Sequence, residues 1–174
     1  AQRRDVDYLM RLDPDRLLHS FRRNAGLPSQ AQPLGGWEGP EVELRGHTLG
    51  HYLSACELMF EATGDERLAQ RARAIVAELA KVQRELAVRG ATAGYLSAFP
   101  ESFFDRLEAR TNVWAPYYTL HKSLAGLLEV HRATGGLGFF IWNSYMGGSL
   151  PQIVVGMISI GIAGYLSSTA IRMI

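Results

Sequence analysis

Residues 46–64 read Gly-His-Thr-Leu-Gly-His-Tyr-Leu-Ser-Ala-Cys-Glu-Leu-Met-Phe-Glu-Ala-Thr-Gly, and this stretch decides the fold. Its large apolar residues recur at steps of three and four, which is the spacing of one face of an α-helix. They are Leu49, Tyr52, Leu53, Cys56, Met59 and Phe60. We therefore predict a helix that begins at about Gly46 and ends at Thr63 and Gly64.

A second amphipathic helix is predicted directly after this one. Asp65 is a typical N-cap residue, and arginines and glutamates occupy what would be the outer face of the helix. The inner face would carry Leu68, Ala72, Ile75, Val76, Leu79, Gln83 and Leu86. Because only a short turn joins the two helices, we expect an antiparallel hairpin.

Prolines mark the starts of three other helices. Asp13 and Pro14 begin one, and a turn-rich loop over 28–40 follows it. A short helix over 101–109 and a third long helix follow Pro100 and Pro116. The expected buried positions are Leu17, Leu18 and Phe21 in the first of these helices, and Leu120, Leu124, Leu127 and Leu128 in the last.

The ends of two long helices repeat. The third long helix ends at 133–135 with Ala-Thr-Gly, as the first does at 62–64. The repeat predicts stacked hairpins, as in toroids with an inner and an outer ring of helices; the alternative is coincidence in a short motif. A repeat would also place an amphipathic helix after Gly135, and the sequence has none there.

The residues after 134 are apolar instead. No Asp, Glu, Lys, Arg or His occurs between Ala133 and Ile171. About twenty uncharged residues follow Pro151, which is long enough for a membrane span. The predicted fold is thus all-α: a partial toroid of hairpins over 1–134, then a segment over 135–174 with a membrane-type helix at 150–171. A buried core helix is the alternative for this segment.

Composition narrows the function classes. The net charge is +1 and basic residues are interleaved with acidic ones, so we expect no nucleic-acid partner. Cys56 is the only cysteine, which excludes an internal disulfide and a zinc site built from several thiolates of this chain. No signal segment precedes the first helix, and we expect a processed or fragmentary N-terminus.

His47 and His51 form the first candidate site. They are four residues apart and so share one helical face near its N-terminus. The spacing suits metal ligands, but Thr48 occupies the position where the zinc-protease pattern needs glutamate. Neutral imidazole both donates and accepts hydrogen bonds, which favours contact with sugar hydroxyls over metal binding, with simple packing as the alternative.

Aromatic and acidic side chains near the helix starts are further candidates. Aromatic rings there are either sugar-stacking faces or core residues: Trp37, Tyr95, Trp114, Tyr117 and Tyr118. A glycosidase needs two carboxylates that flank the scissile bond. The candidates are Glu38, Glu101 and Asp105, and their separation is not fixed by the sequence.

Five motifs in order resemble the N-terminal region of the bacterial β-L-arabinofuranosidase family of glycoside hydrolases. They lie at 16–27, 35–38, 46–55, 94–101 and 115–122, and the resemblance covers about residues 5–134. It implies an (α/α)6 barrel and hydrolysis of arabinofuranosyl linkages. It also implies that a sugar-binding funnel is lined by Trp37, Glu38, His47, His51, Tyr117, Tyr118 and His121.

The family's chemistry does not carry over by this resemblance. Family members use a cysteine nucleophile on a zinc held by further cysteines and a glutamate, with another glutamate as acid/base, all later in the chain. We therefore expect no catalytic residue, metal ligand or cofactor in this chain. The expectation is a truncated glycosidase with little or no activity that still contacts arabinose-containing oligosaccharides.

The last segment resembles a different class of protein. Residues 136–174 are similar to the C-terminal end of an inner-membrane permease of the nitrate, sulfonate or taurine class of ABC importers. We expect two origins joined near 134–136, with the inner membrane as the location if the tail inserts. Two other functions stay open: a membrane-anchored or transport-associated helical protein, and a sugar-binding module without chemistry.

Overall fold

The computed structural model describes residues 2–134, which form α-helices and one 3-10 turn and contain no strand. The all-α class is therefore confirmed for this part of the chain. The elements are α1 (Gln2–Arg11), α2 (Pro14–Asn24), η1 (Gly36–Glu38), α3 (His47–Thr63), α4 (Glu66–Val88), α5 (Ser102–Glu108) and α6 (Pro116–Thr134).

The predicted hairpin is α3 followed by α4. Gly64 ends α3 with a φ of 69°, a left-handed conformation that favours glycine, and its N–H donates to the Phe60 carbonyl at 2.7 Å. The Asp65 side chain then accepts the N–H of Arg67 at 3.1 Å and caps α4. Local sequence chemistry thus sets both sides of the turn.

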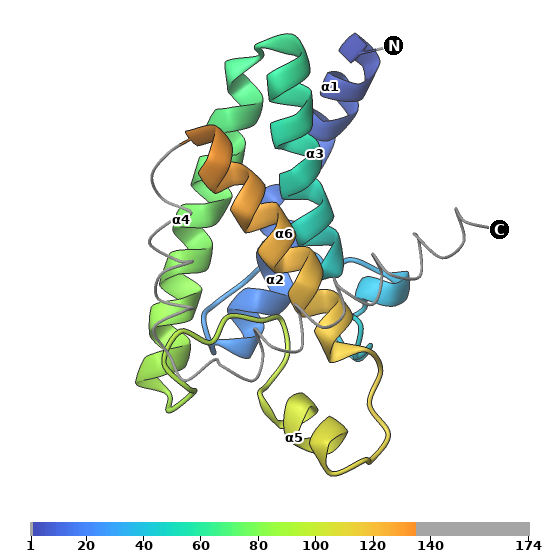
Figure 1. Ribbon diagram of the computed structural model, residues 1–174, viewed down its shortest axis with the longest axis vertical. Helices are drawn as coiled ribbons and strands as arrows, with labels where there is room; N and C mark the ends of the chain where they lie inside the picture. Colours follow the sequence, from blue (N-terminus) through green and yellow to red (C-terminus); the bar gives the residue numbers. More distant parts are fainter. Residues whose placement is uncertain (1, 135–174) are drawn as a thin grey trace, which may run out of the picture.

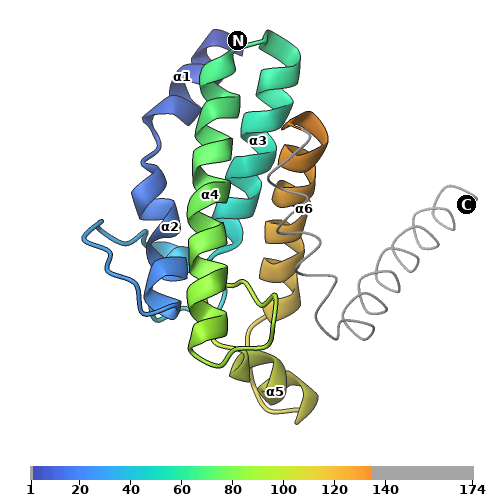
Figure 2. The same cartoon turned by 90° about the vertical axis from the view of Figure 1, so that its left-hand side faces the viewer.

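Helix α6 lies beside α3 and runs in the same direction (Figure 1). The two pack more closely than any other pair of helices, and their backbones meet at Gly50 and Gly126. In Figure 2, α1 and α2 lie on the opposite side of the α3–α4 hairpin from α6. The N-terminal ends of α3 and α6 are consequently at the same end of the bundle, near α5.

The core follows the predicted stripes with one exception. All seven inner-face residues of α4 are buried, as are Leu49, Tyr52, Leu53 and Cys56 of α3, while Met59 and Phe60 pack against the core in part. The prediction for Leu128 was wrong, because its side chain is 39% exposed. Leu128 lies about 100° around the helix from the buried Leu127, at the edge of the apolar stripe.

Helix α1 was not predicted, because most of its residues are charged or polar. It is tied to the hairpin by polar contacts. The Arg71 guanidinium donates to the carbonyls of Met10 at 2.8 Å and Leu12 at 2.9 Å, and the Tyr52 hydroxyl donates to the Leu9 carbonyl at 3.0 Å. These contacts satisfy carbonyls at the end of α1 that have no partner within the helix.

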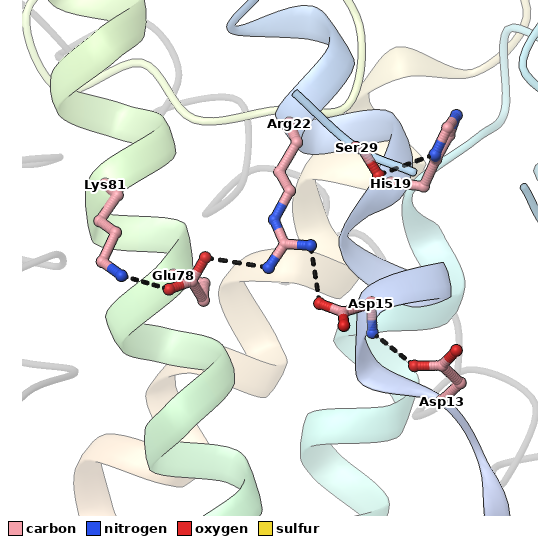
Figure 3. Close-up of polar contacts among 7 residues, drawn as sticks. All are labelled: Asp13, Asp15, His19, Arg22, Ser29, Glu78 and Lys81. Carbon is pink, nitrogen blue, oxygen red and sulfur yellow. Dashed lines mark hydrogen bonds and ion pairs between the residues drawn. The ribbon is translucent and has the colours of Figure 1, made fainter. Parts of the chain in front are cut away.

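Helix α2 begins as predicted, with Asp13 accepting the N–H of Asp15 at 2.9 Å. Figure 3 shows how it is joined to α4. Arg22 lies between two carboxylates, with Asp15 at 2.7 Å and Glu78 at 2.9 Å, and Glu78 also pairs with Lys81. The chain of charges fixes α2 against α4.

None of the helices within residues 2–134 is both long and apolar enough to cross a membrane. The membrane-type helix predicted at 150–171, and the whole segment 135–174, lie outside the described residues.

Candidate functional site

Three predicted site residues gather where α3 and α6 begin. The rings of His47 and His51 are 6.1 Å apart between centroids and perpendicular to each other. The Tyr118 ring lies 5.9 Å from His47 and 6.5 Å from His51, and its hydroxyl oxygen is 3.4 Å from His51 Nε2. We call these three residues the His-Tyr cluster.

Glu38 holds the start of α3 from outside the helix. The N-cap residue is Gly46, which has no side chain to bond the first N–H groups. Glu38 is buried, and its carboxylate accepts the N–H of Gly46 at 2.6 Å and that of Thr48 at 2.7 Å. A carboxylate at this end also interacts favourably with the helix dipole.

The hydrogen bonds of His47 orient its ring. Nδ1 lies 2.9 Å from the Leu44 carbonyl oxygen and 2.9 Å from Glu38 Oε1. Because both partners are acceptors, Nδ1 is the donor and Nε2 is left for a ligand. Thr119 of α6 donates to the same Leu44 carbonyl at 3.0 Å, which ties α6 to the loop just before α3.

The surroundings of His51 favour its neutral form. Partial burial lowers its pKa, and the positive charge of Lys122 lowers it further. The Lys122 ammonium lies 5.2 Å from the centre of the Tyr118 ring, on whose face a cation is attracted. A neutral imidazole beside a phenol hydroxyl offers both donors and acceptors to a polyhydroxylated ligand.

The other predicted site residues occupy different places. His121 is exposed on α6. Tyr117 faces α5, where its ring packs on Phe104 at 5.0 Å, and burial raises its pKa. Trp37 is exposed and meets Trp114 edge to face at 6.3 Å. The structure therefore brings His47, His51 and Tyr118 together over Glu38 and separates Tyr117 from them.

The zinc chemistry implied by the family resemblance does not fit the described residues. Among residues 2–134, no group of three or more His, Cys, Asp or Glu side chains is placed to hold a metal ion. Cys56 is buried in the core, and burial raises the pKa of its thiol to about 11. A buried thiol with a raised pKa carries little thiolate near neutral pH, which fits a core residue better than a nucleophile.

A known family of proteins matches most of this chain. The family model described as beta-L-arabinofuranosidase, GH127 catalytic domain, matches residues 1–140. The chain belongs to this family. The match contains all five sequence motifs and every residue of the His-Tyr cluster, and it includes 135–140, the first part of the predicted tail. No curated protein matches the chain.

Membership of the β-L-arabinofuranosidase family supports a glycoside hydrolase fragment and gives no support to a permease segment at 136–174. The resemblance to a permease stays a prediction, and so does the insertion of residues 150–171 into a membrane. Three residues that support the cluster were not predicted: Lys122, Thr119 and Leu44. The position of Lys122 could have been predicted from the sequence, since it follows Tyr118 by four residues and shares its helical face.

Proposed function

We propose that the His-Tyr cluster binds an arabinofuranosyl ring, as part of the glycoside hydrolase domain to which the chain belongs. The observation that carries the proposal is the convergence of His47, His51 and Tyr118 at one end of the bundle, within the family match. Sugar hydroxyls need partners that donate and accept, and both imidazoles and the phenol supply them.

The proposal includes the toroid predicted from the repeated helix endings. In such a fold the inner helices run parallel to one another and each is followed by an antiparallel outer helix. Helices α3 and α6 run in the same direction and pack closely, and α4 runs back antiparallel to α3, which supports reading α3 and α6 as neighbouring inner helices. The sugar would then lie at the end of the inner ring where both helices begin.

The remaining predicted residues take supporting roles in this proposal. Glu38 positions His47 and the first turn of α3, since both its oxygens already accept hydrogen bonds there. Trp37 and His121 are exposed and would form the rim of the site. Tyr117 would hold α6 against α5 through Phe104.

We assign the acid/base and nucleophile roles to residues outside 2–134. Glycoside hydrolysis needs two carboxylates on either side of the bond. Within residues 2–134, the carboxylate of Glu38 contacts the cluster. This carboxylate is already used in hydrogen bonds to the start of α3. Zinc-dependent hydrolysis of an aryl β-L-arabinofuranoside by this chain would contradict that assignment.

Calorimetry tests the binding proposal. Methyl β-L-arabinofuranoside is titrated into the full chain and into the Tyr118→Phe and Tyr8→Phe variants. Each variant loses one exposed phenol hydroxyl, but Tyr8 lies on α1 away from the cluster. We expect Tyr118→Phe to weaken binding roughly tenfold, the loss of about one hydrogen bond, and Tyr8→Phe to leave it unchanged. No heat with the unchanged chain would overturn the proposal.

A further inference from the structure

We propose that a pocket at the C-terminal end of α2 binds a tetrahedral oxyanion, a phosphate or sulfate group, between Arg23 and Arg45. The pocket has a volume of about 260 Å³ and is lined from α2, from the loop before α3 and from the segment that contains Ala98. None of its lining residues belongs to the His-Tyr cluster, so the proposal does not depend on sugar binding there.

Arg45 brings a half-buried positive charge to the pocket. Its Nε donates to the Ala98 carbonyl at 2.9 Å and its Nη1 to the Val42 carbonyl at 3.0 Å. Nη2 has no hydrogen-bond partner among residues 2–134, and no carboxylate of that range forms an ion pair with the guanidinium. Burial lowers the Arg45 pKa, because the charged form has lost part of its hydration. An anion at Nη2 would supply the partner that this cation lacks.

Arg23 supplies a second cation from α2. Its side chain is exposed, and its guanidinium forms no ion pair among the described residues, whereas the neighbouring Arg22 pairs with Asp15 and Glu78. Both Arg23 and Arg45 line the pocket, although they come from different elements. Two guanidinium groups that approach from different elements present several N–H donors, which suits the four oxygens of a tetrahedral anion.

The charges around the pocket favour an anion. Of the described residues that line it, Glu41 is the acidic one, and it offsets one of the two arginine charges. His19 also lines the pocket, four residues before Arg23 on the same face of α2. Burial and the charge of Arg23 lower the His19 pKa, the Ala31 backbone raises it, and Arg22 lowers it. With a neutral imidazole, the pocket keeps a net positive charge.

Hydrogen bonds already hold the walls of the pocket in place. Asn24 Nδ2 donates to the Ser97 carbonyl at 3.0 Å and to the Phe99 carbonyl at 2.8 Å. Arg45 binds the Ala98 carbonyl that lies between these two residues in the chain. This segment is thereby joined both to the end of α2 and to the loop before α3. Because the walls are positioned before an anion arrives, binding requires little further ordering.

The imidazole of His19 reports on an anion in the pocket. Its Nδ1 lies 3.0 Å from Ser29 Oγ (Figure 3), and a bound anion would offset the Arg23 charge and raise the His19 pKa. This pKa is followed by NMR in the full chain as sulfate or acetate is added, with chloride keeping the ionic strength constant. Sulfate is the main probe because it does not change its charge over the titration.

Three variants of the full chain are titrated in the same way. Arg23→Gln removes one cation from the pocket, and Glu41→Gln removes its acidic charge. Arg84→Gln is the matched control, since Arg84 is an exposed arginine of α4 that does not line the pocket. Circular dichroism confirms that each variant keeps its helices. Affinity is taken from the dependence on anion concentration, because Arg23→Gln by itself raises the starting His19 pKa.

We expect sulfate to raise the His19 pKa in a saturable way that chloride does not reproduce. Arg23→Gln should weaken sulfate binding roughly tenfold, the loss of about one charge-assisted contact, and Glu41→Gln should strengthen it roughly twofold. Arg84→Gln should leave it unchanged. No saturable shift, the same shift with chloride, or equal losses of affinity in Arg23→Gln and Arg84→Gln would overturn the site. Tighter binding of acetate than of sulfate would overturn its assignment to a tetrahedral anion.

Calorimetry then distinguishes the two sources of such an anion. Inorganic phosphate and glycerol phosphate are titrated into the full chain at a pH where both are dianions. Tighter binding of glycerol phosphate assigns the site to phosphate esters of small molecules, and equal or weaker binding assigns it to the free ion. Failure of either anion to bind would overturn the site and leave the proposed sugar binding at the His-Tyr cluster untouched.

Discussion

Gly50 of α3 and Gly126 of α6 lie backbone to backbone where the two helices pack. A Cβ atom at Gly126 would be 2.4 Å from the Gly50 carbonyl oxygen, and one at Gly50 would be 2.1 Å from the Lys122 carbonyl oxygen. Both clashes are with main-chain atoms, which cannot rotate away as a side chain can. The close approach sets the spacing of the helix starts that carry His47, His51 and Tyr118.

Replacing either glycine by alanine should separate α3 from α6. We expect Gly50→Ala and Gly126→Ala each to lower the free energy of unfolding by about 3 kcal/mol or more, since overpacking in a rigid contact is destabilising. Gly35→Ala is the control, because Gly35 has a negative φ and open space around it. Urea unfolding midpoints measure the effect, and a midpoint unchanged in Gly126→Ala would show that the helices do not touch there.

Removing the Glu38 carboxylate should loosen the start of α3. Glu38→Ala leaves two N–H groups of α3 without their acceptor, and we expect a loss of roughly 1–2 kcal/mol in stability. Glu41→Ala, in the same loop but exposed, should change stability by less than about 0.5 kcal/mol. Equal effects of the two substitutions in thermal unfolding would argue against the capping role.

The charge of Lys122 should be visible in the titration of His51. Burial and Lys122 both lower the His51 pKa, so Lys122→Met is expected to raise it toward its ordinary value. Lys81→Met, which removes an exposed cation from α4, should leave it unchanged. The imidazole resonances followed against pH by NMR measure both variants, and a lower His51 pKa in Lys122→Met would contradict the arrangement.

Glu57 of α3 should make stability depend on pH in an unusual direction. It is 1% exposed, and its carboxylate has no hydrogen-bond partner among the described residues. Burial raises its pKa; Arg73 opposes the shift, and Glu61 and Glu129 add to it. Because the folded-state pKa lies above the unfolded value, the contribution of Glu57 to stability is fully present at acidic pH and is lost as pH rises through the folded-state pKa.

The variant Glu57→Gln isolates this effect. We expect its stability to match that of the unchanged chain at about pH 4 and to exceed it by roughly 1–3 kcal/mol at about pH 7, where the chain must otherwise bury a charge or hold a proton. Glu61→Gln, one turn further along α3, is the control and should give a smaller difference. A Glu57→Gln chain less stable at neutral pH than at acidic pH, relative to the unchanged chain, would refute the assignment.

The sequence predicted the helices that have a clear local pattern. The stripes of α3 and α4, the Gly64 and Asp65 turn and the prolines before α5 and α6 all depend on residues close in the chain. Helix α1 was missed because its place is set by Arg71 and Tyr52, which are distant in sequence. Leu128 was misplaced because a hydrophobic residue next to a buried one need not share its face.

The site was predictable in part for the same reason. The four-residue spacing of His47 and His51 shows that they share a helical face, and the structure adds that Tyr118 joins them from α6. Nothing local shows that Glu38 caps a helix that begins several residues later, or that Trp37 meets Trp114. Those relationships exist only once α3 and α6 have packed together.

Binding of an arabinofuranosyl sugar at the His-Tyr cluster can be observed by imidazole NMR of the five histidines. Methyl β-L-arabinofuranoside is titrated into the isotope-labelled full chain at constant pH. We expect saturable shifts of the His47 and His51 resonances and none for His19, which lies on α2 beside Ser29. Shifts confined to His19, or no shift of His47 and His51 at saturating sugar, would contradict it.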